Sequence, residues 1–231
     1  MGKDVIIACD FPGGRECLEF LDKFKGRRPY IKIGMELYYA TGPDFVRELK
    51  SRGYSIFLDL KLHDIPNTVR RASTVLGRLG VDMLNVHAAG GSAMMAAALL
   101  GIAEAGSDTR IIAVTQLTSI SPEVLKGELL IDQPLDMVVQ QYAKNAKAAG
   151  LAGVVCSPLE AEVVHAACGV DFLTVTPGVR FAGTDAGDQI RITTPARAKQ
   201  LGSDYIVVGR PITSAADPTA AYDRCTGEFI G

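Results

Sequence analysis

Short apolar runs rich in β-branched residues alternate with longer amphipathic segments along the whole chain. The short runs cover residues 5–9, 30–34, 55–60, 83–87, 111–116, 153–156, 172–175 and 205–208, and continuous apolar runs of this length are typical of strands buried on both faces. Helical periodicity covers residues 15–24, 43–52, 68–79, 92–105, 134–149, 159–167 and 195–201. Eight strand and helix units in 231 residues favour a closed (β/α)8 TIM barrel over an open doubly wound sheet, which would usually use fewer strands.

No linker rich in serine, proline or charge divides the chain, so we expect a single domain over residues 1–231. The N-terminus lacks the apolar core of a signal peptide, and no later stretch reaches about eighteen uninterrupted apolar residues. We therefore expect a cytoplasmic protein without a membrane partner.

The distribution of charge argues against a nucleic-acid binder, and the spacing of the cysteines argues against a metal or disulfide site. The net charge is −2 and the lysines and arginines are scattered, so the basic stripe of a nucleic-acid binder is absent. The five cysteines are odd in number and show no C-x-x-C spacing, which predicts reduced core residues rather than a metal or disulfide site.

The third strand carries the first candidate chemistry, because Asp59, Lys61 and Asp64 interrupt a run that otherwise reads as buried. Alternate residues of a strand point to the same side, so Asp59 and Lys61 are predicted to share a face. Buried charge is costly even when paired, and this cost favours a functional role. A plain ion pair at the rim of a sheet is the alternative.

Active sites of such barrels lie at the carboxyl ends of the strands, and polar residues gather there in this sequence. They are Asp10, Lys32, Asp59, Lys61, His87, Gln116, Thr118, Gly209 and Arg210. With Asp64, two lysines and three carboxylates are predicted to meet at one barrel mouth, where the carboxylates favour the charged form of each lysine. A protonated lysine beside a reacting carbon can stabilise a carbanion and then donate a proton to it.

Two segments indicate a phosphorylated substrate. The first segment follows the eighth strand and consists of Gly209, Arg210 and Pro211. The glycine permits close approach to the backbone, and the proline suits the first turn of a helix. Together with the arginine, they can bind phosphate. The connection over residues 176–191 is far longer than a usual βα loop, and its glycines with Arg180 and Arg191 suggest a lid over an anion. An ordinary turn and a disordered surface loop are the respective alternatives.

The motif from Asp59 to Thr68, Asp-x-Lys-x-x-Asp-Ile-Pro-Asn-Thr, resembles the signature of the orotidine 5′-phosphate decarboxylase family. The resemblance extends along essentially the whole chain, through Asp10 and the segments 31–34, 86–88, 115–119, 176–180 with Gln189, and 208–212. It implies cofactor-free conversion of orotidine 5′-phosphate to uridine 5′-phosphate and carbon dioxide, the last step of de novo pyrimidine nucleotide synthesis.

The resemblance also implies residue roles. Lys61 is the expected proton donor to C6 within a network of Lys32, Asp59 and Asp64. In a homodimer, Asp64, Ile65 and Thr68 are expected to complete the partner's pocket. The remaining expected substrate contacts are Asp10 and Lys32 for the ribose hydroxyls, Thr118 for the pyrimidine edge, Gln189 for the base and phosphate, and Pro177, Arg180, Gly209 and Arg210 in the phosphate region.

Two rival functions remain open. Mg²⁺-dependent 3-keto sugar-phosphate decarboxylases and aldolases share the Asp-x-Lys-x-x-Asp strand but carry glutamate where this chain has Lys32, and a lysine there repels a metal. A non-catalytic phosphate-binding barrel would have lost Lys61 or one of its carboxylates, and all are present. No metal is expected, because none of the three histidines, His63, His87 and His165, has a partner at metal-ligand spacing. His87 is a candidate for contact with the charged residues.

Overall fold

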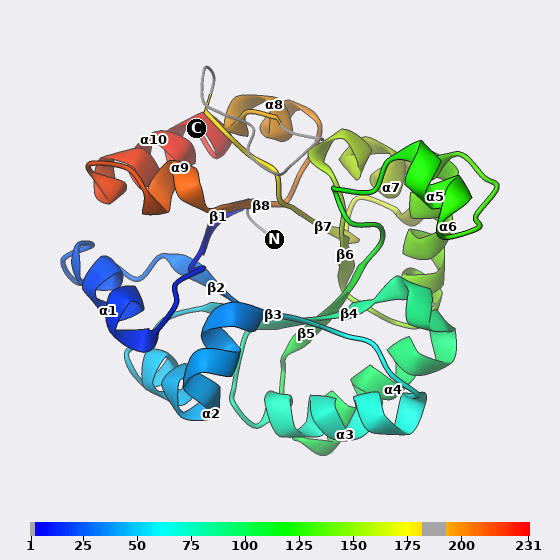
Figure 1. The fold of residues 1–231 in the computed structure, drawn as a ribbon, viewed down its shortest axis with the longest axis horizontal. Coiled ribbons are helices and arrows are strands. Elements are labelled where there is room, and N and C mark those ends of the chain that lie inside the picture. The colour runs from blue at the N-terminus through cyan, green and yellow to red at the C-terminus, as the bar shows by residue number, and fades with distance from the viewer. Residues whose placement is uncertain (1–2, 182–192) are drawn as a thin grey trace.

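A closed barrel of eight parallel strands in sequential order forms the centre of the protein (Figure 1). The computed structural model describes residues 3–181 and 193–231. The strands are β1 (Asp4–Ala8), β2 (Tyr30–Gly34), β3 (Ile56–Leu62), β4 (Met83–His87), β5 (Arg110–Val114), β6 (Gly153–Val155), β7 (Leu173–Thr176) and β8 (Tyr205–Val208), and β1 closes on β8. The predicted (β/α)8 TIM barrel is therefore confirmed.

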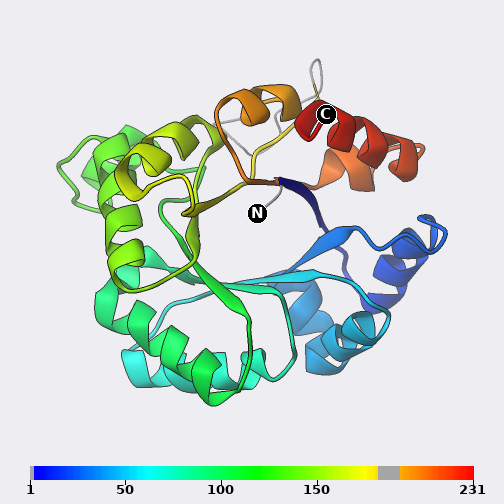
Figure 2. The ribbon, with the colours of Figure 1, turned by 180° about the vertical axis from the view of Figure 1, so that it is seen from behind.

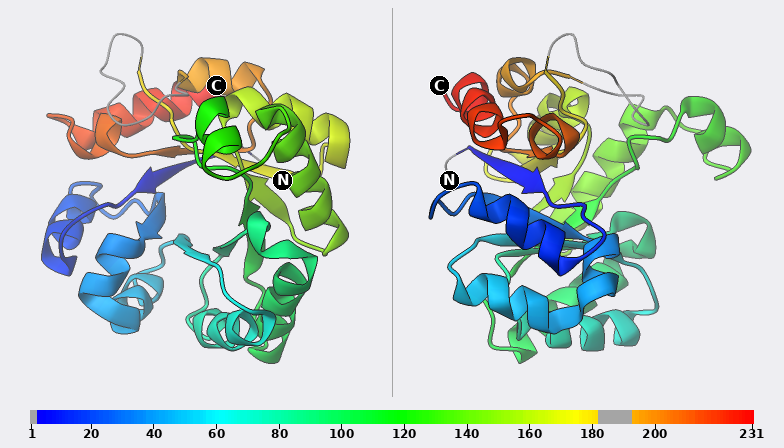
Figure 3. Two further views of the ribbon diagram at one scale, coloured as in Figure 1. Left: turned by 45° about the vertical axis from the view of Figure 1, so that its right-hand side comes forward. Right: turned by 60° about the vertical axis from the view of Figure 1, so that its left-hand side comes forward.

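Helices surround this barrel as an outer ring, as the views from behind and from the sides show (Figures 2 and 3). They are α1 (Gly14–Asp22), α2 (Met35–Ser51), α3 (Pro66–Gly77), α4 (Gly91–Glu104), α5 (Pro122–Gly127), α6 (Leu135–Ala148), α7 (Ala161–Cys168), α8 (Pro195–Gln200), α9 (Arg210–Thr213) and α10 (Pro218–Phe229). Short 3₁₀ turns, η1 (Ala88–Gly90) and η2 (Pro158–Glu160), precede α4 and α7.

The strands are apolar on both faces because each face packs against a different layer. Along β1, Val5 and Ile7 belong to the layer between strands and helices, whereas Ile6 belongs to the cluster inside the barrel with Phe57 and Ile112. Each of these side chains is at most 1% exposed, and burying one stabilises the fold by about 1.5–3 kcal/mol. This two-sided burial explains why the strands read as continuous apolar runs.

Five strands end at residues other than those predicted: β1, β6 and β7 differ by one residue, and β3 and β5 differ by two. β3 continues to Leu62, past the charged residues, because the chain bulges between Leu58 and Leu62 and then pairs with β4 again. β5 ends at Val114, so Gln116 lies in the connection that follows the strand.

The helices show two further differences. α2 begins at Met35 and is broken at Gly42, whose φ of 71° lies outside the helical region, so the predicted helix over 43–52 corresponds to its second part. The helices α5 and α10 lie outside the segments predicted from periodicity. For α10 the signal lies at its start, where the Asp217 side chain accepts hydrogen bonds from the backbone of Thr219 and Ala220.

All five cysteines are buried, so their prediction as core residues is confirmed. Across residues 3–181 and 193–231, no helix combines the length and apolar character needed to cross a membrane.

Candidate active site

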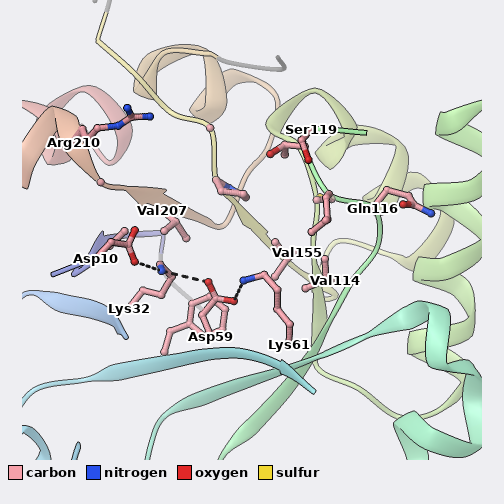
Figure 4. A pocket seen from close by; sticks show the side chains of 18 of the residues that line it. Asp10, Lys32, Asp59, Lys61, Val114, Gln116, Ser119, Val155, Val207 and Arg210 are labelled. Carbon is pink, nitrogen blue, oxygen red and sulfur yellow. Dashed lines mark hydrogen bonds and ion pairs between the residues drawn. The ribbon is translucent and has the colours of Figure 1, made fainter. Parts of the chain in front are cut away.

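A cavity of about 710 Å³ opens at the carboxyl ends of the barrel strands (Figure 4). Residues from most of the strands and from the connections behind them line it. They are Ala8, Asp10, Lys32, Phe57, Asp59, Lys61, Val114, Gln116, Leu117, Thr118, Ser119, Val155, Cys156, Pro177, Gly178, Arg180, Val207, Gly209 and Arg210. The cavity thus brings together the residues predicted at the barrel mouth except His87 and Asp64.

Four charged side chains of alternating sign form a continuous row in this cavity, marked by dashed lines in Figure 4. Lys32 Nζ lies 2.8 Å from Asp10 Oδ1 and 3.4 Å from Asp59 Oδ2. Lys61 Nζ lies 2.7 Å from Asp59 Oδ1. We call Asp10, Lys32, Asp59 and Lys61 the charged row.

The two central members of the charged row are nearly withdrawn from solvent, since the side chains are 10% exposed for Lys32 and 13% for Asp59. Burial would lower the pKa of Lys32, but the adjacent Asp59 and Asp10 outweigh burial and raise this pKa. Burial would likewise raise the pKa of Asp59, yet Lys32, Lys61 and the hydrogen bonds to the carboxylate hold it below its ordinary value. Both groups are therefore charged at neutral pH.

Asp59 and Lys61 do share a face, although regular alternation of β3 is not the reason. Lys61 adopts a left-handed backbone conformation with φ of 52°, and its backbone N–H donates to Asn85 Oδ1 at 2.7 Å. Asn85 Nδ2 in turn donates to Asp59 Oδ1 at 2.6 Å. The pair therefore belongs to a bonded unit in the cavity wall and is not a plain ion pair at an exposed rim.

Gly34, at the end of β2, leaves the space that the charged row needs. A Cβ atom on Gly34 would lie 2.9 Å from Lys32 Nζ and 3.1 Å from Asp10 Oδ1. Because Gly34 has a φ of −88°, its backbone conformation suits any residue. The requirement for glycine here is steric.

The opposite side of the cavity carries the residues predicted to bind phosphate. Pro177, Gly178 and Arg180 follow β7, and Gly209 and Arg210 follow β8, in the two connections that commonly bind phosphate in such barrels. Figure 4 shows Arg210 on the other side of the cavity from Lys61. Gln189, Arg191 and most of the predicted lid lie outside the described residues.

Asp64, Ile65 and Thr68 do not line the cavity of their own chain. All three are exposed at the start of α3, with 68% of Ile65 accessible, and the Asp64 carboxylate accepts a hydrogen bond from the Ile65 backbone at 2.7 Å. Their expected contribution to a partner subunit remains a prediction.

The histidines differ in their relation to the site. The His87 ring lies 5.6 Å from the His63 ring, and burial, with the nearby His63 and Lys61, lowers the pKa of His87. His87 is thus a neighbour of the charged row, as anticipated. His165 contacts Asp204 at 3.1 Å, and neither residue lines the cavity.

Sequence reasoning missed two residues that support the charged row, Asn85 and Gly34. Asn85 had a readable signal, because it is the one polar side chain in the interior of the otherwise apolar run 83–86. The steric role of Gly34 had none, since it depends on a neighbour that only the folded barrel brings close.

A family model and the curated relatives of this chain point to the same family. Residues 3–225 match the model of the "Orotidine 5'-phosphate decarboxylase / HUMPS family". The chain is 56% identical to orotidine 5′-phosphate decarboxylase of Cutibacterium acnes, over 94% of this chain and 92% of the relative. It is 51% identical to the enzyme of the same name from Bacillus cytotoxicus, over 100% and 99% of the two chains.

Solved structures agree with this match. A crystal structure of orotidine 5′-phosphate decarboxylase from Lactobacillus acidophilus superposes with a TM-score of 0.88 at 43% identity, covering 99% of this chain and 100% of that one. An uncharacterised conserved protein from Geobacillus kaustophilus superposes with a TM-score of 0.87 at 48% identity, covering 97% and 99%.

Proposed function

The chain belongs to the Orotidine 5'-phosphate decarboxylase / HUMPS family and is a carboxy-lyase, and we propose that it converts orotidine 5′-phosphate to uridine 5′-phosphate and carbon dioxide without a cofactor. This reaction would be the last step of de novo pyrimidine nucleotide synthesis. The observation that carries the proposal is the charged row of Asp10, Lys32, Asp59 and Lys61.

The position of Lys32 favours this reaction over the reactions of the Mg²⁺-dependent sugar-phosphate enzymes. Its ammonium lies between the Asp10 and Asp59 carboxylates, where a positive charge already neutralises both. A divalent cation at the same place would meet a like charge, which is unfavourable.

We propose that Lys61 is the proton donor. The bond between C6 and the substrate carboxylate breaks, carbon dioxide leaves, and the electron pair stays on C6. The Lys61 ammonium then donates a proton to C6, and solvent restores the proton on Lys61. Asp59 supports this role because its carboxylate accepts a hydrogen bond from Lys61 Nζ and fixes the direction of the side chain.

The energetic demand of this reaction exceeds what a single lysine supplies. The carbanion at C6 has no adjacent electron sink, so the barrier must fall by an amount toward the upper part of the roughly 8–23 kcal/mol that enzymes achieve. One ammonium about 4 Å from the carbanion gives about 4 kcal/mol at an effective dielectric of about 20. Binding energy from other parts of the substrate must therefore contribute.

The remaining substrate contacts are those that the family resemblance implies, and the cavity lining supports them. Asp10 and Lys32 would hold the ribose hydroxyls, Asp59 would lie beside them, and Thr118 would meet the pyrimidine edge. The phosphate would bind across the cavity. Its expected ligands are Pro177, Arg180, Gly209 and Arg210, with Gln189 from outside the described residues.

We also propose that the active unit is a homodimer in which Asp64, Ile65 and Thr68 enter the partner's site. Their exposure next to their own barrel mouth supports this arrangement, since an exposed isoleucine beside an exposed carboxylate suits an interface. The carboxylate of Asp64 would then add the third anion to the partner's charged row.

A direct assay tests the reaction. Purified protein in EDTA is mixed with orotidine 5′-phosphate, and the ultraviolet absorbance change is followed with chromatographic identification of uridine 5′-phosphate. Rapid conversion is expected. Activity only on a 3-keto sugar phosphate after Mg²⁺ is added would assign the chain to the other branch of the family, and no activity on either would favour a binding protein.

A further inference from the structure

Asn85 is a polar side chain in the interior of an apolar strand. It lies in the middle of β4 and is 0% exposed. A buried amide is costly unless its donor and acceptor are both satisfied. Both are satisfied here by the charged row, since Lys61 N–H donates to Asn85 Oδ1 at 2.7 Å and Asn85 Nδ2 donates to Asp59 Oδ1 at 2.6 Å.

The position of Asn85 matches the irregular part of β3. Leu58 pairs with Leu84, and Leu62 pairs with Val86, so residues 59–61 of β3 stand opposite the single residue Asn85. The extra residues interrupt the ladder between the two strands. The Asn85 side chain replaces the lost ladder acceptor for Lys61 N–H.

This bond acts on a residue with an unusual backbone. Lys61 has a φ of 52°, in the left-handed region that residues with a side chain rarely adopt. The left-handed residue lets the chain bulge while the Lys61 side chain still reaches Asp59 at 2.7 Å. Such a conformation persists only where surrounding contacts over-determine it.

The same amide also fixes the carboxylate that Lys61 contacts. Asp59 Oδ1 accepts from both Asn85 Nδ2 and Lys61 Nζ, and Asp59 Oδ2 lies 3.4 Å from Lys32 Nζ. With these contacts the carboxylate has partners on both oxygens and little freedom to rotate. One asparagine thus restrains the backbone of the lysine and the carboxylate that directs its side chain.

We propose that Asn85 is a positioning residue that holds Lys61 in its left-handed conformation and aims its ammonium at the reacting carbon. This inference rests on the proposed function of Lys61 as proton donor. Asparagine suits the task because one side of its amide accepts and the other donates, so the two partners fix its orientation. Leucine has a similar size but offers neither bond, and aspartate offers the donor only when it is protonated.

The first test is Asn85→Leu, with Thr109→Val as its matched control. Thr109 is also buried, and its hydroxyl donates to Val81 O at 2.6 Å, before β5 and away from the cavity. We expect Asn85→Leu to lower kcat about 100-fold while KM changes less than about threefold, because misplacement of a catalytic group by about 1 Å has this effect. Thr109→Val keeps kcat, and an unchanged kcat in Asn85→Leu overturns the proposal.

The second test is Asn85→Asp, which makes the bridge depend on pH. Aspartate at this position repels Asp59 when ionised but restores the donor when protonated. Its other titratable neighbours are Lys32, Lys61 and His87, which the wild type shares, so the ratio of variant to wild-type kcat isolates the new group. This ratio should rise at least about tenfold from pH 8 to pH 5.5, since a one-unit change in pH alters protonation about tenfold. A pH-independent ratio as low as that of Asn85→Leu contradicts the bridging role.

A structural readout separates this proposal from the proposed function. In a crystal structure of Asn85→Leu, Lys61 should leave the left-handed region and its Nζ should move away from Asp59. Unchanged Lys61 geometry overturns the positioning role. If the wild type fails to decarboxylate orotidine 5′-phosphate, the proposed function falls, and this geometry still decides whether Asn85 positions Lys61. Should the leucine variant not fold, the same readout is taken from Asn85→Asp.

Discussion

Lys61 and Asp59 are in contact at 2.7 Å across a bulge in β3, on the floor of a cavity at the carboxyl ends of the barrel strands. The contact links a lysine that can donate a proton to a carboxylate whose pKa is lowered by its cationic neighbours despite burial, which would raise it.

Arg210→Ala should lower kcat/KM for orotidine 5′-phosphate by about 100-fold, because an arginine on a phosphate makes charge-assisted hydrogen bonds worth about 1.5–3 kcal/mol each. The variant should not affect turnover of orotidine, which lacks the phosphate. Steady-state kinetics on both substrates, with the surface variant Arg197→Ala as control, measure this difference. An equal loss on both substrates would remove Arg210 from the phosphate site.

Gly34→Ala should reduce activity although it adds only a methyl group. The new Cβ would lie 2.9 Å from Lys32 Nζ and would displace this ammonium from Asp10. We expect kcat/KM to fall about 10-fold to 100-fold with a small change in stability, since small shifts in catalytic geometry are costly. Gly227→Ala, where a Cβ meets nothing within 4 Å and φ is not positive, controls for loss of a glycine. Full activity in Gly34→Ala would show that the charged row tolerates the shift.

The folded protein should lose stability on acidification partly through Asp59. Because the folded-state pKa of Asp59 lies below its ordinary 3.8, its ion pairs stabilise the fold above that value and this stability is lost as pH falls through the folded pKa. Asp59→Asn removes that dependence. The free energy of unfolding is measured with urea between about pH 5 and about pH 3. It should fall more steeply with decreasing pH in the wild type than in Asp59→Asn, by at most about 1.4 kcal/mol per pH unit. Parallel curves would contradict the lowered pKa.

Asp64→Asn and Lys61→Ala should each be nearly inactive alone and partly active when mixed. In a heterodimer, one site combines Lys61 from one chain with Asp64 from the other. Random exchange of subunits then restores about a quarter of wild-type activity, because half the dimers carry one intact site. Activity is measured after denaturation and joint refolding. If heterodimers are shown to form but activity does not recover, Asp64 acts in its own chain or not at all.

The sequence predicted the barrel and most of the site because both leave local signals. Strands β2, β4 and β8 match their predicted bounds, and the run Tyr205–Val208, for example, is apolar on both faces and is followed by a glycine. All four residues of the charged row were predicted to lie at the barrel mouth, whereas Asp64, the fifth charged residue predicted there, does not line the cavity.

The unpredicted features depend on contacts between strands. Periodicity places Asp59 and Lys61 on one face but does not reveal the bulge or the left-handed Lys61 that Asn85 stabilises. The need for Gly34 arises from the Lys32 ammonium above it. The proposed role of Asp64 would depend on a second copy of the chain, which no pattern within one chain specifies.

The most direct test of the account compares wild type and Lys61→Ala in single-turnover decarboxylation of orotidine 5′-phosphate, with product affinity for uridine 5′-phosphate measured by calorimetry. We expect the rate to fall by at least about 1,000-fold, since Lys61 is assigned a carbanion contact of about 4 kcal/mol, while the variant still binds uridine 5′-phosphate. A variant that keeps its decarboxylation rate would contradict the assignment of Lys61 as proton donor.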